Sequence, residues 1–391
     1  MTAISPNFTP MNGTRSWEVD ALRGLMLVLM TVTHLPTRLT SPLGQPFGFV
    51  SAAEGFVLLS AYVAGLVYSR LAYRSGIDAM RQAFWRRALK VYLCQAATLI
   101  FLFTVIAWIG LKIDQPAVKD LMSFYLQYPY RALAGGLLLV YQPPLLDILP
   151  LYILFMLASP WVLAWAMHNG WAPVLWCSFA LWLLAQFGWG SRLYELFADA
   201  TGLLVAVDET GSFVPLAWQL LWVVGLWIGA SRNAPDAIPI VFSRSTLRIA
   251  SLLAVAGLVW RHALGQAPFG ADVMLNLLFD KWLLGPLRLL DLTALGIVTV
   301  AFGPWLARHM PRQRWLETMG AASLPVFCAH LVVVLLALTF FGGDPLSKPW
   351  WLDALLLIGC FAVLYAVAVI SGWLDERSGG PGARPQASAI G

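Results

Sequence analysis

The sequence predicts an all-α, polytopic integral membrane protein with about ten transmembrane helices and both termini in the cytoplasm. Three observations support this fold class. Of 391 residues, 59% are hydrophobic and only 12% are charged, whereas a soluble domain usually carries about 25% charged residues. The mean hydropathy is +0.73. Long apolar segments recur from one end of the chain to the other, and Lys and Arg are distributed unevenly between the loops that join them.

The apolar segments have the length of membrane spans. About 20 residues of helix are needed to cross a hydrocarbon core of about 30 Å. Ten segments approach this length, and they cover residues 21–35, 47–69, 88–110, 145–165, 171–188, 214–230, 246–264, 289–307, 321–341 and 351–373. Because no soluble domain or inverted repeat interrupts them, residues 1–376 are expected to form one transmembrane domain. Residues 377–391, rich in Gly, Pro, Ala and Ser, are expected to be a disordered cytoplasmic tail.

The orientation follows from the Lys and Arg residues, since short loops rich in these residues stay in the cytoplasm. With the N-terminus inside, fifteen of the 25 Lys and Arg residues fall on the cytoplasmic side and nine on the other, while Arg23 lies within the first span. This bias predicts a multi-pass protein of the bacterial inner membrane. The first apolar segment contains charged residues and lacks a cleavage site, which predicts a retained helix rather than a signal peptide.

Several functional classes are disfavoured by composition. The net charge of +5 largely restates the loop bias, so no nucleic-acid partner is expected. The four cysteines lie in apolar segments without the spacing of metal ligands, which predicts packing residues and no metal site. Nothing in the sequence specifies an oligomeric state or a permanently bound cofactor.

Ionisable side chains within the first span are candidates for function, because a charge at bilayer depth is costly. Asp20 and Arg23 are three residues apart and therefore share one helix face. A structural ion pair accounts for them as well as a functional role does. His34 lies fourteen residues beyond Asp20, roughly 21 Å along a helix, and is thus expected near the opposite membrane face.

Glu54 in the second span is the most prominent buried carboxylate. It lies about seven residues into a segment that runs back from the periplasm, at nearly the depth expected for His34. A hydrogen bond between Glu54 and His34 is therefore geometrically possible. An unpaired carboxylate in an apolar span would be strongly disfavoured, so a partner is expected. The small residues around Glu54 indicate close helix packing.

Four other residues carry polar groups of interest. Arg86 and Arg87 open the third span, either as a topology signal or as a clamp for the phosphates of a cytoplasmic ligand. Asp147 begins the fourth span, where a carboxylate is favourable at a helix N-terminus. His330 is expected near mid-membrane in the ninth span.

The two longest extramembrane segments lie on the predicted periplasmic side and are rich in aromatic residues. The first contains Tyr125, Tyr128, Tyr130 and Tyr141. Interfacial aromatic rings most often anchor helix ends. The alternative is a surface that binds sugars, because apolar ring faces can stack on pyranose faces.

In these segments the chain resembles the OpgC family and, more distantly, the acyltransferase-three superfamily of membrane enzymes. The strongest similarity lies in EVDALRGLMLVLMTVTHL and FVSAAEGFVLLSAYVAGLVYSR, with weaker similarity in FWRRALKVY, LLDILPLYILFMLASP and SLPVFCAH. The resemblance implies transfer of an acyl group, in this family a succinyl group, from cytoplasmic acyl-CoA to osmoregulated periplasmic glucans. It also implies that His34 is catalytic and that Arg86 and Arg87 contact the donor.

The resemblance and the residues together suggest a mechanism. The groups expected to bind the donor run from the cytoplasmic end past mid-membrane: Arg86, Arg87, Asp20, Arg23, Ser60 and Tyr62. The residues expected to be catalytic lie towards the periplasm: His34, Glu54 and Asp147. His34 would be the general base for a glucan hydroxyl, oriented by Glu54 or Asp147. A covalent acyl intermediate on His34 or Ser60 is a variant of this mechanism. The competing class is a transporter or flippase of an anionic or sugar substrate.

Overall fold

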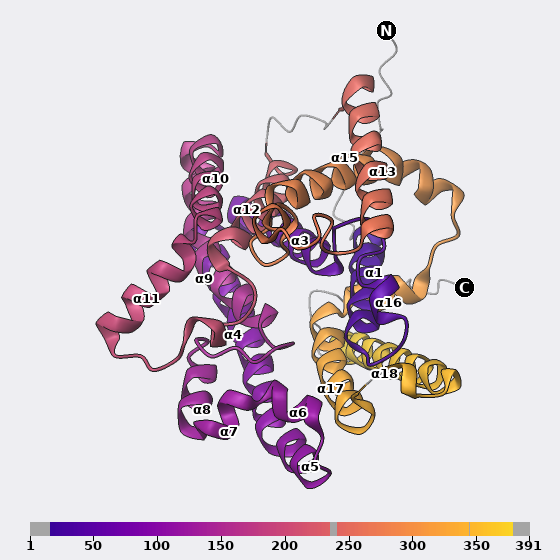
Figure 1. Cartoon of the computed structure of the whole chain (residues 1–391). Coiled ribbons are helices and arrows are strands. Elements are labelled where there is room, and N and C mark those ends of the chain that lie inside the picture. The colour runs from indigo at the N-terminus through magenta and orange to yellow at the C-terminus, as the bar shows by residue number, and fades with distance from the viewer. Residues whose placement is uncertain (1–15, 235–240, 344, 378–391) are drawn as a thin grey trace, which may run out of the picture.

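The computed structural model describes residues 16–234, 241–343 and 345–377. These residues form a bundle of helices with no strand among them. The predicted tail therefore lies outside the described residues, except for Arg377. A helix coincides with each of the ten predicted spans: α1 (Trp17–His34), α3 (Ala52–Ser75), α4 (Ile77–Phe101), α9 (Ile148–Asn169), α10 (Ala172–Gln186), α12 (Pro215–Ser231), α13 (Arg244–Leu264), α15 (Pro286–His309), α17 (Ser323–Phe341) and α18 (Trp350–Arg377) (Figure 1).

Within the described part of the chain, seven helical spans are long and apolar enough to cross a membrane, or eight if a bent pair is one span. The seven comprise α3, α9, α13, α15, α17, α18 and the continuous stretch Ile77–Lys112, in which a π-helical turn joins α4 to α5 (Ala107–Lys112). The bent pair is α10 with α11 (Trp189–Thr201), which meet at 83°. Of the remaining helices, α12 has only 17 residues, and α1 carries Glu18, Asp20 and Arg23 within 18 residues. The count of ten spans stays a prediction.

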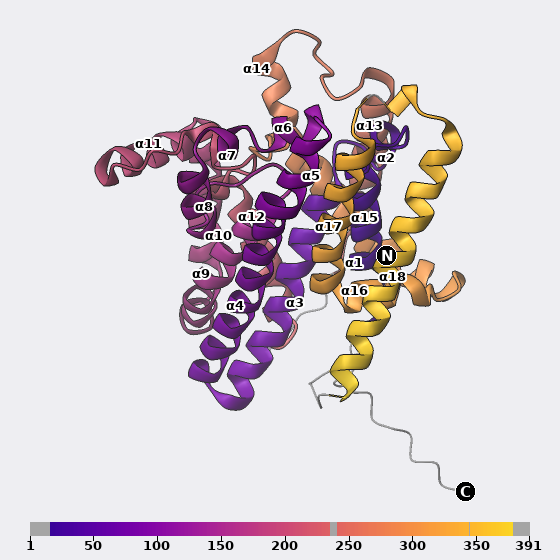
Figure 2. The same cartoon turned by 90° about the horizontal axis from the view of Figure 1, so that it is seen from below.

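Short helices gather at the two ends of the bundle. They are α2 (Thr40–Leu43), α6 (Pro116–Leu121), α7 (Ser123–Gln127), α8 (Pro129–Leu137), α14 (Val273–Asn276) and α16 (Arg314–Ala321). In Figure 2, α6, α7, α11 and α14 lie at one end, and the turn between α3 and α4 lies at the other. We call these the predicted periplasmic and predicted cytoplasmic ends.

Glycines permit the closest helix contacts in the bundle. A side chain at Gly229 of α12 would overlap the Tyr62 carbonyl of α3, and one at Gly320 of α16 would overlap the Asp20 carbonyl of α1. Such small-residue contacts are how membrane helices approach each other closely. They fix α3 against α12 and α1 against α16, which positions the polar residues described below.

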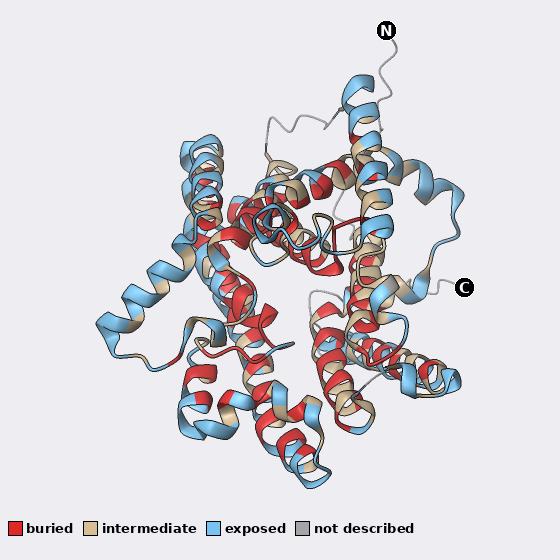
Figure 3. Ribbon diagram, viewed as in Figure 1, coloured by how far each residue is buried: buried red, intermediate tan, exposed pale blue. Residues whose placement is uncertain are grey.

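The outward faces of several helices are exposed, as Figure 3 shows for α10, α11, α13 and α18, and they carry large apolar side chains. On α13 these include Ile249, Leu252 and Val255. A contiguous apolar exterior is expected where lipid replaces water as the solvent. Of the four cysteines, all free, only Cys360 is buried and Cys177 is exposed. The expectation that all four are core packing residues was therefore wrong for Cys177.

Candidate functional site

Two histidines from helices far apart in sequence form a pair inside the bundle. His34 is the last residue of α1, and His330 lies in the middle of α17 and is fully buried. His34 Nδ1 lies 3.1 Å from His330 Nε2, and the two rings are stacked with centroids 5.3 Å apart. One nitrogen of this contact must carry the proton and donate it. The other nitrogen of His34 is not used by this hydrogen bond.

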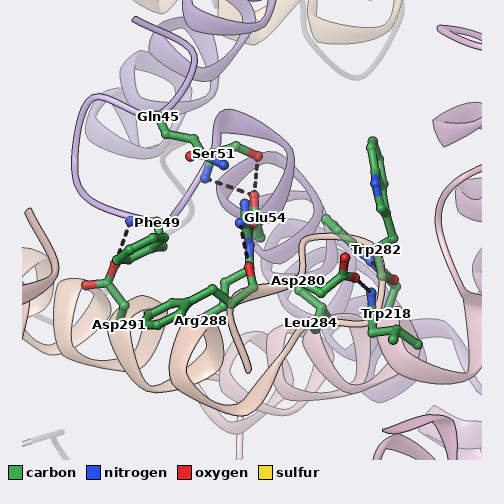
Figure 4. A network of polar contacts seen from close by, with 12 residues as sticks. Gln45, Phe49, Ser51, Glu54, Trp218, Asp280, Trp282, Leu284, Arg288 and Asp291 are labelled. Carbon is green, nitrogen blue, oxygen red and sulfur yellow. Dashed lines mark hydrogen bonds and ion pairs between the residues drawn. The ribbon is translucent and has the colours of Figure 1, made fainter. Parts of the chain in front are cut away.

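Glu54 is held by a different set of partners (Figure 4). Its carboxylate forms an ion pair with Arg288 Nε of α15 and accepts hydrogen bonds from the Ser51 hydroxyl and from the Ser51 backbone N–H, the latter at 3.1 Å. Glu54 is 0% exposed and Arg288 is 2% exposed. Ser51 is the N-cap of α3 and Glu54 is its N3 residue, so the two form a capping box.

The expected hydrogen bond between Glu54 and His34 is therefore contradicted. His34 bonds to His330, and the Glu54 carboxylate is occupied by Arg288 and Ser51. Depth along a helix could be estimated from the sequence, but the direction of the side chain could not. The capping box turns the Glu54 carboxylate back towards its own N-cap.

Asp147 also differs from its expected role as an orienting group for His34. It is the buried N-cap residue of α9, and its Oδ2 accepts a hydrogen bond from the Ser212 N–H at 3.2 Å. The Asp147 carboxylate interacts electrostatically with the ammonium group of Lys281, a loop residue. Lys281 also interacts electrostatically with Glu54, Arg288 and His34. Burial lowers the pKa of Lys281, while the nearby Glu54 carboxylate acts to raise it. The electrostatic influence of Lys281 thus reaches both Asp147 and His34.

A narrow cavity of about 20 Å³ lies between α1, α3, α4, α9 and α17. It is lined by Arg23, Ser60, Arg87, Tyr152 and Ser323, together with four apolar side chains. Arg23 donates a hydrogen bond to the Ser323 hydroxyl and lies 3.8 Å from Asp20. The Ser60 Oγ is buried and has no hydrogen-bond partner within the described part of the chain.

The structure thus brings together only part of the predicted donor-binding set. Arg23, Ser60 and Arg87 line one cavity and Asp20 adjoins it. Arg86 is exposed and does not line the cavity. Tyr62 is likewise not part of the lining, and its backbone packs against Gly225 and Gly229 of α12.

Aromatic side chains connect the cavity with the histidine pair. Phe56 and Phe327 line the cavity and stack on each other with centroids 5.8 Å apart. The Phe327 ring centroid lies 5.4 Å from that of His330. Contacts therefore run from the cavity through Phe327 to His330 and from His330 to His34.

Sequence reasoning underestimated three residues near this site. Arg288 and Lys281 were counted only as periplasmic positive charges, and Asp291 was not considered. Asp291 accepts a hydrogen bond from the Phe49 backbone N–H at 2.9 Å, which fixes the loop that precedes Ser51. The signal was present, because Arg288 and Asp291 are an i,i+3 pair at the start of an apolar span. Within the described residues, no group of three or more His, Cys, Asp or Glu side chains could hold a metal ion.

The comparisons with known proteins identify a family. A family model described as "OpgC protein" matches residues 15–376, which is nearly the whole chain. No curated protein and no solved structure matches the chain.

Proposed function

The chain belongs to the OpgC family, and from this premise we propose that it is a membrane-bound O-acyltransferase. It moves an acyl group, in this family a succinyl group, from acyl-CoA on the cytoplasmic side to hydroxyl groups of a periplasmic glucan. The observation that carries the proposal is the hydrogen-bonded pair of His34 and His330 within an apolar bundle. Intramembrane ionisable residues of this kind are typical of functional sites.

His34 acts as the general base, and His330 positions it. In this assignment His34 Nδ1 carries the proton and donates it to His330 Nε2, at the observed separation of 3.1 Å. His34 Nε2 then has a free lone pair that can accept a proton from a substrate. His330 thereby takes the orienting role that the sequence suggested for Glu54 or Asp147, because a fixed tautomer is what such a partner provides.

The reaction is a direct transfer from thioester to alcohol. The glucan oxygen attacks the thioester carbonyl carbon while His34 Nε2 takes the hydroxyl proton. The carbon–sulfur bond then breaks, and the imidazolium returns this proton to the CoA sulfur. The Lys281 ammonium, which interacts electrostatically with His34, stabilises the negative charge that develops on the carbonyl oxygen. The products are an ester on the glucan and free CoA.

Arg23 and Arg87 hold the donor. Both line the same cavity as Phe56 and Phe327, and guanidinium groups bind phosphates through paired hydrogen bonds. Ser60, with an unsatisfied buried hydroxyl in the same cavity, is a further contact for the thioester arm. The arm would extend from these residues towards the histidine pair.

The experiment that tests this function uses purified protein in sealed lipid vesicles. Unmodified periplasmic glucan is placed on one side and succinyl-CoA, radiolabelled in the succinyl group, on the other. The proposal predicts label covalently attached to glucan and an equal amount of free CoA. If labelled material crosses the vesicle wall while the glucan stays unmodified, the protein is a transporter and the proposal is contradicted.

The same assay distinguishes the roles of the two adjacent arginines, Arg86 and Arg87. Arg87→Ala should raise the KM for acyl-CoA by roughly tenfold or more, because a charge-assisted phosphate contact contributes about 1.5–3 kcal/mol. Arg86→Ala is the matched control, since Arg86 is exposed and outside the cavity, and its KM should stay near that of the wild type. An unchanged KM for acyl-CoA in Arg87→Ala would assign both residues to topology rather than to donor binding.

A further inference from the structure

A second, larger groove lies apart from the histidine pair, between α11 and the α7–α8 region. Its volume is about 570 Å³, within the range of about 300–1,000 Å³ that small-molecule sites occupy. The chemically distinctive lining residues are three aromatic and three charged ones: Phe124, Tyr128, Tyr194, Arg131, Glu195 and Asp199. α7 and α11 lie at the predicted periplasmic end, with α8 below α7 (Figure 2).

The four tyrosines of the predicted periplasmic segment have different surroundings. Tyr125 stacks on Phe103, and Tyr141 is 1% exposed. Tyr130 is 89% exposed and does not line the groove. Only Tyr128, which is 44% exposed, presents its ring to the groove. The first two are therefore packing residues, and Tyr128 is the candidate for ligand contact.

The groove combines groups that suit a carbohydrate. Aromatic rings offer flat apolar faces for the C–H faces of sugar rings, and carboxylate and guanidinium groups can pair with neighbouring hydroxyls. Arg131 lies over the Tyr128 ring, 5.0 Å from its centroid. Tyr194 is fixed by the hydrogen bond that its hydroxyl donates to the Val205 carbonyl at 2.8 Å. Both charge signs in one groove disfavour a lipid tail as its ligand.

Helix α11 has the geometry of a helix that lies on the membrane surface. It turns 83° away from α10, and its groove-facing residues Tyr194, Glu195 and Asp199 share one side of the helix. Leu196 and Phe197, on the other side, are apolar and more than half exposed. An amphipathic helix of this type lies in the interfacial layer with its polar side towards water. The groove is then accessible from the aqueous phase.

One segment of chain connects the groove with Asp147, which interacts electrostatically with Lys281. Val205 and Val207 line the groove. Glu209 accepts a hydrogen bond from the Gln142 N–H at 3.0 Å. Ser212 donates to Asp147 at 3.2 Å, and Asp147 interacts electrostatically with Lys281. A polymeric ligand that lies along this segment would extend from the groove to Asp147.

We propose that this groove binds a stretch of the acceptor glucan that is remote from the reacting hydroxyl. The inference rests on the proposed function, because it identifies the groove's ligand with the acceptor. The aromatic rings contact successive sugar residues, and Arg131, Glu195 and Asp199 hydrogen-bond to their hydroxyls. Binding there raises the residence time of the glucan at the site without taking part in the chemistry.

The test compares Tyr128→Ala with Tyr130→Ala in the purified protein. Loss of a stacking ring should raise the KM for unmodified glucan by roughly threefold to tenfold, with kcat at saturating glucan and the KM for acyl-CoA unchanged. Tyr130→Ala, a change of the same kind two residues away on an exposed ring, should match the wild type. Glu195→Gln combined with Asp199→Asn should raise the same KM without affecting folding, because both side chains are exposed.

A direct measurement of glucan binding tests the groove proposal independently of the proposed acyltransferase function. Isothermal titration of unmodified glucan into donor-free protein should give weaker binding for Tyr128→Ala than for Tyr130→Ala. If that difference is found but the wild type transfers no acyl group, the groove is supported and the acyltransferase proposal fails. If the wild type acylates glucan and Tyr128→Ala has the glucan affinity and KM of the wild type, the groove proposal alone is overturned.

Discussion

Replacing His34 by alanine should lower the turnover of acyl transfer by roughly 10²–10⁴-fold, the contribution typical of a general base. His330→Ala should cause a smaller loss, because it leaves the base in place but removes the partner that fixes its tautomer. The kcat of purified protein is the measurement, normalised to folded protein by size-exclusion chromatography and thermal melting. His262→Ala is the matched control, since His262 is exposed, and should behave as the wild type.

The double variant His34→Ala/His330→Ala tests whether the two imidazoles act as one unit. Residues that act together show strongly non-additive effects. The double variant should therefore be scarcely slower than His34→Ala alone. If the fold-losses in kcat of the two single variants multiply in the double variant, His330 contributes independently of His34. A folded His34→Ala protein with wild-type kcat would contradict the assignment of the base.

Glu54→Ala should destabilise the protein by about 3–5 kcal/mol, the cost typical of removing one partner of a buried ion pair. Arg288 would be left buried and without its carboxylate partner, and Ser51 would lose its capping contact. The measurement is the melting temperature and yield of protein extracted from membranes. The molecules that do fold should retain acyl transfer, because Glu54 makes no hydrogen bond with the histidine pair within the described chain.

A paired substitution separates this structural role from a catalytic one. Replacing both partners, as in Glu54→Gln/Arg288→Met, should recover much of the stability lost in Glu54→Ala, since the unpaired buried charge is then gone. A Glu54→Ala protein that melts like the wild type but transfers no acyl group would show instead that the carboxylate takes part in the reaction.

The membrane helices could be predicted from composition because hydropathy reports directly on burial in lipid. A helix coincides with each apolar segment, including α1, whose three charged residues keep it below a simple hydropathy threshold. The predicted span 321–341 begins within two residues of the start of α17 (Ser323–Phe341), but the separate short helix α16 (Arg314–Ala321) in front of it was not predicted. The 83° turn at α11 follows Gly188, which adopts a positive φ of 77°, a conformation that favours glycine.

Several residues of the candidate site could be predicted from the sequence, but their pairings could not. The sequence identified His34, Glu54 and His330 as unusual buried groups, since intramembrane ionisable residues are rare. It could not show that Glu54 turns towards Ser51 and Arg288, because that depends on the rotation of α3 about its axis and on a residue 234 positions away. The pairing of His34 with His330 similarly depends on how α1 packs against α16 and α17.

The central claim is tested most directly by mass spectrometry of periplasmic glucans. Glucans would be compared from cells that lack this protein and from the same cells supplied with the wild type or with His34→Ala. The account predicts an acyl mass increment, that of succinyl in this family, only on glucans from cells with the wild-type protein. Identical glucan masses with and without the wild-type protein would contradict the account.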